Sequence, residues 1–129
     1  MLTPLFLSLA EVFEIHSDQI ERYGGRAGLR DLGLLQSALA MPAAGFGGRY
    51  LHSDLYEMAA AYLFHIAQNH PFVDGNKRTG VVAAIVFLSL NGIELEADEA
   101  KLEKLVLDVT QAKAGKDTGA DFFRNNSRA

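Results

Sequence analysis

Residues 70–90 read HPFVDGNKRTGVVAAIVFLSL, and this stretch decides the fold. Its second half, from Val81 to Leu90, is apolar nearly all round, which is typical of a helix buried on most of its sides. We predict this helix over about residues 76–91 and place it at the centre of the structure. Because the helix begins just after Gly75, the polar half of the stretch lies at its N-terminus. Unpaired backbone N–H groups and the helix dipole attract anions there.

Apolar periodicity and capping signals predict about six helices. They are expected over residues 9–23, from 31 to about 41, over 54–69, over 76–91, from 98 to a stop at 115, and from about 118 to a polar tail, with a short extended segment over 93–96. Ser8 with Glu11 and Asp54 with Glu57 have the spacing of a capping box. The glycine-rich stretch 43–52 reads as a loop or a short, loose hairpin. The sequence therefore predicts an all-α fold, a compact helical bundle around the central helix.

Length and composition narrow the class of protein. A chain of 129 residues that is 49% hydrophobic can build one core, so we expect a single domain over 1–129. The net charge of −4 argues against a basic nucleic-acid surface, and the absence of cysteine excludes disulfides and zinc fingers. The apolar run 81–90 is far shorter than the ~20 residues of a membrane span. We expect a cytoplasmic protein with no membrane and no direct nucleic-acid partner.

The polar residues before the central helix are suited to phosphate chemistry. Gly75 lets backbone N–H groups approach an anion, while Lys77 and Arg78 supply a point charge and a planar fork. Asp74 is a carboxylate that could bind the divalent metal of a nucleotide. His70, with an ordinary pKa near ~6.5, could take a proton from an attacking hydroxyl. The combination predicts a phosphoryl or nucleotidyl transferase.

Each of these residues also has a simpler interpretation. His70 could be a helix-end residue, Asp74 a turn residue, and Lys77 with Arg78 a solvated first turn, although cations there oppose the helix dipole. The pattern of a P-loop is absent, because arginine follows Lys77 and no glycine lies five residues before it. A zinc site formed by His65, His70 and Asp74 is a further alternative, without a tight ligand spacing.

The stretch resembles the signature of the Fic/Doc (Fido) family, His-x-Phe-x-Asp/Glu-Gly-Asn-Gly-Arg-x-x-Arg. Six positions agree with it: His70, Phe72, Asp74, Gly75, Asn76 and Arg78. Lys77 replaces the second glycine and Val81 the second arginine, and both differences are those of the Doc branch, the death-on-curing toxins of toxin–antitoxin systems. The segments 22–25, 38–42 and 91–93 are also similar to Doc-type toxins. The resemblance implies a Fido-type helical bundle.

The resemblance also implies a role for each motif residue. His70 is the expected general base, and Asp74 the expected ligand of Mg²⁺. The phosphates of ATP are expected to bind Gly75, Asn76, Lys77 and Arg78. Phe72 is the expected anchor that holds the loop in place.

Doc-type toxins transfer the γ-phosphate of ATP to a hydroxyl of a target protein, elongation factor Tu, and so arrest translation. The resemblance therefore implies a protein kinase. Fic-type transfer of AMP is the alternative, and a catalytically idle binding protein is a third. Lys77 fills space that a glycine leaves open, and Val81 removes a cation that could hold another phosphate. Both differences favour a reoriented triphosphate and hence transfer of the γ-phosphate.

Two further regions are interpreted through the resemblance. The stretch 43–52 corresponds to the flap that aligns the target chain, with Phe46, Arg49 and Tyr50 as its side chains. The family's inhibitory motif, Ser/Thr-x-x-x-Glu-Gly/Asn, is matched only by Ser17 to Glu21, and the next residue is arginine. Without a built-in inhibitor, the resemblance implies a separate antitoxin whose disordered segment folds on the toxin.

Overall fold

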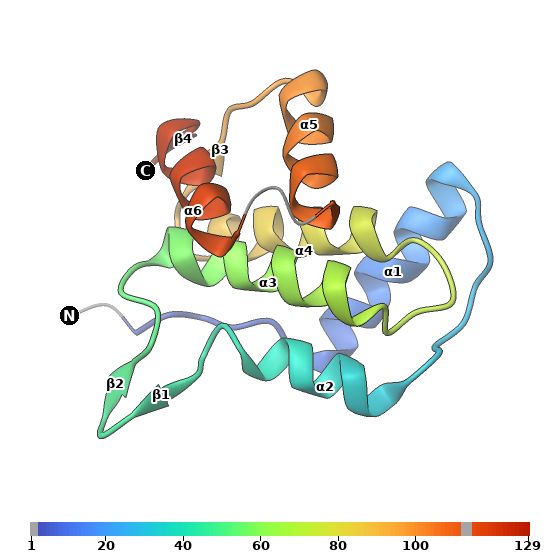
Figure 1. Cartoon of the computed structure of the whole chain (residues 1–129), viewed down its shortest axis with the longest axis horizontal. Helices are drawn as coiled ribbons and strands as arrows, with labels where there is room; N and C mark the ends of the chain where they lie inside the picture. The colour runs from blue at the N-terminus through green and yellow to red at the C-terminus, as the bar shows by residue number, and fades with distance from the viewer. Residues whose placement is uncertain (1–2, 112–114) are drawn as a thin grey trace.

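The computed structural model describes residues 3–111 and 115–129, and within them the chain forms helices with four two-residue strands (Figure 1). The elements are α1 Leu9–Tyr23, α2 Leu32–Ala40, β1 Gly45–Phe46, β2 Arg49–Tyr50, α3 Leu55–Asn69, α4 Asn76–Leu90, β3 Glu94–Leu95, α5 Glu99–Thr110, α6 Lys116–Asn125 and β4 Ser127–Arg128. The all-α fold class and the six helices are confirmed. None of the helices in the described part of the chain is long and apolar enough to cross a membrane.

The pair α3 and α4 forms the centre of the fold, with α2 on one side of α3 and α5 and α6 on the other (Figure 1). The helix over 76–91 is confirmed, but it shares the centre with α3, which is buried at every position from Met58 to Leu63. Small residues let the two helices approach closely. A Cβ on Gly80 of α4 would lie only 3.1 Å from the carbonyl oxygen of Leu63.

Side-chain caps fix the starts of α1, α2, α3 and α5. The capping box of α1 is confirmed, since the Ser8 hydroxyl accepts from the Glu11 N–H and the Glu11 carboxylate accepts from the Ser8 N–H. At α3 only half of the box forms. Asp54 accepts from the Glu57 N–H, but the Glu57 carboxylate binds the N–H and hydroxyl of Ser53. Ser53 offers two donors to one carboxylate, and so it replaces the expected partner.

The C-terminal region differs from the expectation in two ways. α5 ends at Thr110 rather than at Gly115, which instead precedes α6 as its N-cap. The expected polar tail contains the strand β4, which pairs antiparallel with β3 and places Arg128 opposite Glu94. An ion pair of 3.1 Å between Arg128 and Glu96 adds to this pairing. The extended segment over 93–96 is therefore confirmed, and its partner is the chain end.

The hairpin expected over 43–52 is confirmed as β1 and β2, joined by Gly47 and Gly48, which both have positive φ. It precedes the N-terminus of α3, whereas the loop 70–75 follows the C-terminus of the same helix. The two regions therefore lie at opposite ends of α3 (Figure 1). A helix of 15 residues separates its ends by about 22 Å.

Candidate functional site

The candidate site is built on the loop 70–75 between α3 and α4. α3 ends at Asn69, and its C-cap residue is His70, whose φ of 48° and ψ of 53° are left-handed. Pro71 follows and cannot continue the helix. α4 begins after Gly75, which has a φ of 76°, and no side chain caps its N-terminus. The first N–H groups of α4 have no partner within the helix, so they are available to an anion.

The Asn76 side chain closes this loop from inside. Its Oδ1 accepts from the Phe72 N–H at 2.9 Å, and its Nδ2 donates to the Phe72 carbonyl at 3.0 Å. Both residues are buried, Phe72 at 1% and Asn76 at 6% exposure. Phe72 therefore has the buried position that we predicted for an anchor. The Asn76 amide is used within the loop, which leaves its backbone N–H as the group that faces an anion.

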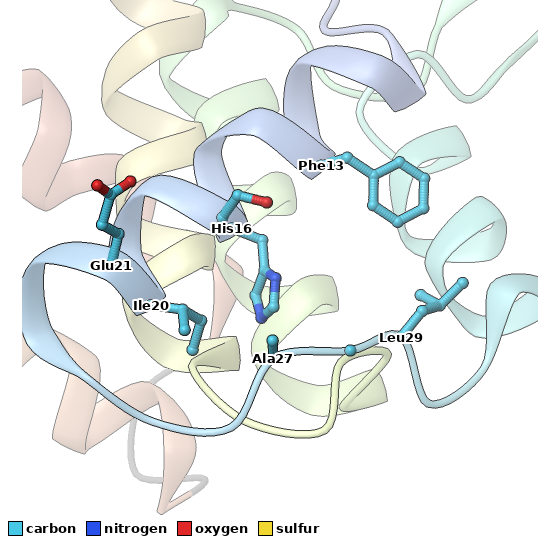
Figure 2. A pocket seen from close by; sticks show the side chains of 8 residues that line it. Phe13, His16, Ile20, Glu21, Ala27 and Leu29 are labelled. Carbon is cyan, nitrogen blue, oxygen red and sulfur yellow. The ribbon is translucent and has the colours of Figure 1, made fainter.

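His16 of α1 contacts the loop at Phe72 and Asp74. The sequence did not identify His16 as a site residue. Its ring stacks on Phe72 at 3.8 Å between centroids with an angle of 6° between the planes, and its Nε2 lies 2.8 Å from the Asp74 carbonyl oxygen. The one signal in the sequence is a histidine on the apolar side of the helix over 9–23. His16 and Ile20 point from α1 toward the segment with Ala27, across a cavity of about 410 Å³ (Figure 2).

Asp74 presents an ionised carboxylate at the surface. Its Oδ2 accepts from the Arg26 N–H at 3.1 Å and its Oδ1 from the Gly75 N–H at 2.8 Å. These two backbone hydrogen bonds, the one from Arg26 first, lower the pKa of Asp74. Charged carboxylate oxygens are the ligands that Mg²⁺ prefers, and each oxygen keeps a further lone pair. The chemistry of this group therefore fits the expected metal.

The two cations of the motif differ in their surroundings. Arg78 donates to the Gly24 carbonyl at 2.9 Å, and its guanidinium lies over the Tyr23 ring at 5.7 Å. It thereby joins the end of α1 to the first turn of α4. Lys77 is exposed on that turn. The Lys77 ammonium is consequently the more open of the two charges.

The segment 24–31 runs along the loop and is bound to it through the backbone. Leu29 and Phe72 form an antiparallel bridge, and the Val73 N–H donates to the Gly28 carbonyl at 3.0 Å. The pairing brings residues 40 or more positions apart in sequence to one place. The site thus consists of the loop, the first turn of α4, the end of α1 and this segment.

The His70 ring is exposed and lies at the edge of the loop. Its Nδ1 is 3.4 Å from the Asn76 Nδ2, which is long for a hydrogen bond and does not fix the tautomer. His70 thus shares one short loop with Asp74 and the first turn of α4, as the sequence predicts. Among the residues that the structure describes, no three His, Asp or Glu side chains group closely enough to hold a metal ion, which argues against the zinc alternative.

The structure does not bring the expected flap to this site. Phe46 is 93% exposed, and the Tyr50 ring contacts Phe6, which in turn stacks on Phe87. Phe87 lies eleven residues after Asn76 on α4, or about 16 Å along the helix axis. Phe46, Arg49 and Tyr50 are therefore separated from the motif by the length of the α3–α4 pair.

Fold and site together define an all-α protein in which a histidine and a carboxylate flank the open N-terminus of a central helix. The family model described as the Fic/DOC family matches residues 6–88, and the chain belongs to this family. The matched region contains the whole loop, α1 and the segment 24–31.

Two curated relatives are similar to the chain. The protein named Toxin Doc, from Mycolicibacterium smegmatis, is 47% identical over 76 residues, which are 59% of this chain and 58% of that protein. This match thus covers less than two thirds of the relative's length. The protein named Protein kinase doc, from Escherichia phage P1, is 31% identical over 118 residues, which are 92% of each chain. The second match covers every element of the site.

Proposed function

We propose that this protein is a Doc-type toxin that transfers the γ-phosphate of ATP to a hydroxyl of a target protein. The observation that carries the proposal is the loop closed by Asn76, which holds His70 and the Asp74 carboxylate beside the uncapped N-terminus of α4. A relative named as a protein kinase, similar over 92% of both chains, supports the same activity.

Each residue has a definite task in the proposed reaction. The target hydroxyl oxygen forms a bond to the γ-phosphorus, the bond to the β-phosphate oxygen breaks, and ADP leaves. His70 takes the proton of the hydroxyl as general base. Asp74 would hold Mg²⁺, and the ion would neutralise the negative charge of the phosphates. The Asn76 N–H and the Lys77 and Arg78 side chains bind the phosphates. Gly75, whose own N–H donates to the Asp74 Oδ1, lets the phosphates approach the backbone closely.

We further propose elongation factor Tu as the target, translation arrest as the outcome, and a cognate antitoxin as the partner. The assignment of the target rests on the resemblance to Doc-type toxins. The antitoxin is supported by the incomplete inhibitory motif, because Ser17 to Glu21 is followed by Arg22, where the motif has glycine or asparagine. An inhibitory segment would therefore come from another chain.

ATP labelled separately at the α and γ positions tests the proposal. The protein is incubated with Mg²⁺ and elongation factor Tu, and the label on the target is measured. We expect label from γ-labelled ATP and none from α-labelled ATP. Label from the α position would establish AMP transfer instead, and no label on any target in a lysate would favour an idle binding protein.

Lys77→Gly tests the residue that distinguishes the two reactions. We expect weaker γ-phosphate transfer, because the substitution removes the exposed ammonium on the first turn of α4. Lys104→Gly on the exposed face of α5 is a control for loss of a lysine from a helix. Unchanged kinase activity in Lys77→Gly would refute the role assigned to Lys77.

A further inference from the structure

We infer that Arg30 is a positioning residue that holds the backbone of His70 in the conformation needed for its role as base. The inference rests on the proposed function and concerns how the base is kept in place. Arg30 lies in the segment 24–31, forty positions before His70 in sequence. It belongs to no part of the motif, and the sequence alone gives it no role.

His70 has an unfavourable backbone conformation. Among the described residues it is the only non-glycine with a positive φ, at 48°. Left-handed geometry brings the Cβ of an L-residue close to its own carbonyl oxygen, so helices that end in this way usually have glycine there. The base itself occupies that position. Surrounding contacts must therefore hold it, since such strain persists only where the structure imposes it.

Arg30 and its neighbour supply these contacts. The Arg30 Nε donates to the His70 carbonyl at 2.6 Å, and Nη2 donates to the Asn69 carbonyl at 3.0 Å. The backbone N–H groups of Arg30 and Asp31 both donate to the Pro71 carbonyl, at 2.7 and 3.0 Å. Three successive carbonyl oxygens are thus bound by two residues. Rotation of His70 out of its left-handed conformation would break these bonds together.

The chemistry of arginine suits this task. A planar guanidinium can donate to two carbonyl oxygens at once, which an ammonium on a flexible chain does less well. Its charge also complements the C-terminal end of the α3 dipole, and α3 has no basic residue in its own last turn. On the other side, the Asn76 amide lies next to the His70 ring. His70 is therefore held at its backbone by Arg30, while its ring only lies in contact with Asn76.

The first test compares Arg30→Ala and Arg30→Lys with the wild type in the γ-phosphate transfer assay. We expect kcat to fall on the order of 10-fold to 100-fold in Arg30→Ala, because a small displacement of the base is costly. The KM for ATP should stay within about twofold, since no Arg30 bond involves the phosphate-binding turn. Arg30→Lys should remain impaired, and added guanidinium should restore part of the activity of Arg30→Ala.

Three outcomes would overturn the inference. They are a kcat in Arg30→Ala equal to the wild type, full activity in Arg30→Lys, and a large rise in KM for ATP, which would place Arg30 on the phosphates. Arg128→Ala removes an equally charged and exposed residue, paired with Glu96 near the chain end, and serves as the control. Its activity should equal that of the wild type.

A second measurement is independent of catalysis. Amide hydrogen exchange in residues 69–75 should become faster in Arg30→Ala, while exchange in α5 should not change. Unchanged exchange in the loop would refute the inference even if activity fell. His70→Ala in the transfer assay separates the two proposals, because wild-type activity there would refute the base and leave the exchange result to decide the role of Arg30.

Discussion

The two ends of the α3–α4 pair are built in different ways. At one end, the loop 70–75 is bound by His16 of α1, by the segment 24–31 and by Asn76 of α4. At the other, the hairpin of β1 and β2 pairs mainly with itself and leaves Phe46 93% exposed. Both stretches contain glycine and phenylalanine, although the hairpin has more glycine. Reactive and charged side chains thus form a candidate site where several separate segments of the chain hold them in place.

The largest expected effect comes from removing the proposed base. His70→Ala should lower the rate of γ-phosphate transfer on the order of 10²–10⁴-fold, because water then has to accept the proton of the target hydroxyl in place of the imidazole. The rate is measured with labelled ATP and purified target. Lys104→Ala, an exposed residue of α5, is the control and should keep the wild-type rate. If His70→Ala transferred the γ-phosphate as fast as the control, the loop 70–75 would not contain the catalytic base, and the two ends would not differ in this function.

A matched pair of phenylalanines tests the difference in stability. Phe72 is 1% exposed and stacked on His16, whereas Phe46 is 93% exposed. Phe72→Ala should lower the free energy of unfolding by about 3–5 kcal/mol, because it empties a packed position. Phe46→Ala should change it by less than about 0.5 kcal/mol. Urea denaturation measures both, and similar losses would show that the hairpin is as tightly integrated as the loop.

A matched pair of glycines tests the surroundings of the proposed metal ligand. Both Gly25 and Gly48 have positive φ, so alanine strains the backbone at each. A Cβ on Gly25 would lie 2.8 Å from the Asp74 Oδ2, whereas a Cβ on Gly48 would meet nothing within 4 Å. Gly25→Ala should therefore displace the carboxylate that the Arg26 N–H binds.

The measurement is the Mg²⁺ concentration that gives a half-maximal transfer rate. We expect it to rise about tenfold or more in Gly25→Ala, as when a group that orients a metal ligand is disturbed. Gly48→Ala should leave it unchanged. An equal Mg²⁺ requirement in both variants would contradict the assignment of Asp74 as the metal ligand.

Local signals made most of the fold predictable. The box at Ser8 and the apolar run 81–90 are short-range patterns with a direct structural meaning, and both held. The strand β4 was missed because a two-residue strand has no periodicity to detect. The Glu57 carboxylate binds the N–H of Ser53 rather than that of Asp54. These two donors are adjacent in sequence, and spacing alone does not decide between them.

The site was predictable only in its contiguous part. The motif loop and its helix could be located because their residues are consecutive in sequence. His16 and Arg30 could not, since each acts through a contact with the loop from a distant segment. The hairpin is a different case, because the resemblance, and not a pattern within the stretch 43–52, assigned it as a flap. The 15 residues of α3, which the sequence predicts as a helix over 54–69, already separate the hairpin from the loop by the length of that helix.

A third region of the molecule is the contact between α3 and α6, which contains His65. His65 of α3 is partly buried, and its Nε2 lies 3.2 Å from the Lys116 Nζ of α6. Burial first, and then the charges of Lys116 and His52, lower the pKa of His65 to about 4. Burial and Lys116 also lower the pKa of His52, whose Nε2 has no hydrogen-bond partner within the described residues.

The sign of the effect follows from these pKa values. Between pH ~6.5 and about 4 the unfolded chain binds a proton at His65 that the folded protein does not. Stability contributed by neutral His65 is therefore present above pH ~6.5 and is lost as the pH falls toward 4. His65→Gln removes this proton uptake. As the pH falls from ~6.5 toward about 4, the urea midpoint of His65→Gln should therefore fall less steeply than that of the wild type. Carboxylates titrate in the same window but contribute equally to both proteins.

Lys116→Gln sharpens the test. Without the ammonium the pKa of His65 should rise toward its ordinary value. The folded and unfolded states then differ less in the protons they bind, so the urea midpoint should also depend less steeply on pH. Phe46→Ala, at the hairpin, should reproduce the wild-type dependence on pH. If the urea midpoint of His65→Gln depended on pH as steeply as that of the wild type, the acid sensitivity of the fold would have to originate in groups other than His65. The α3–α6 contact would then differ no more than the hairpin in its effect on the pH dependence of stability.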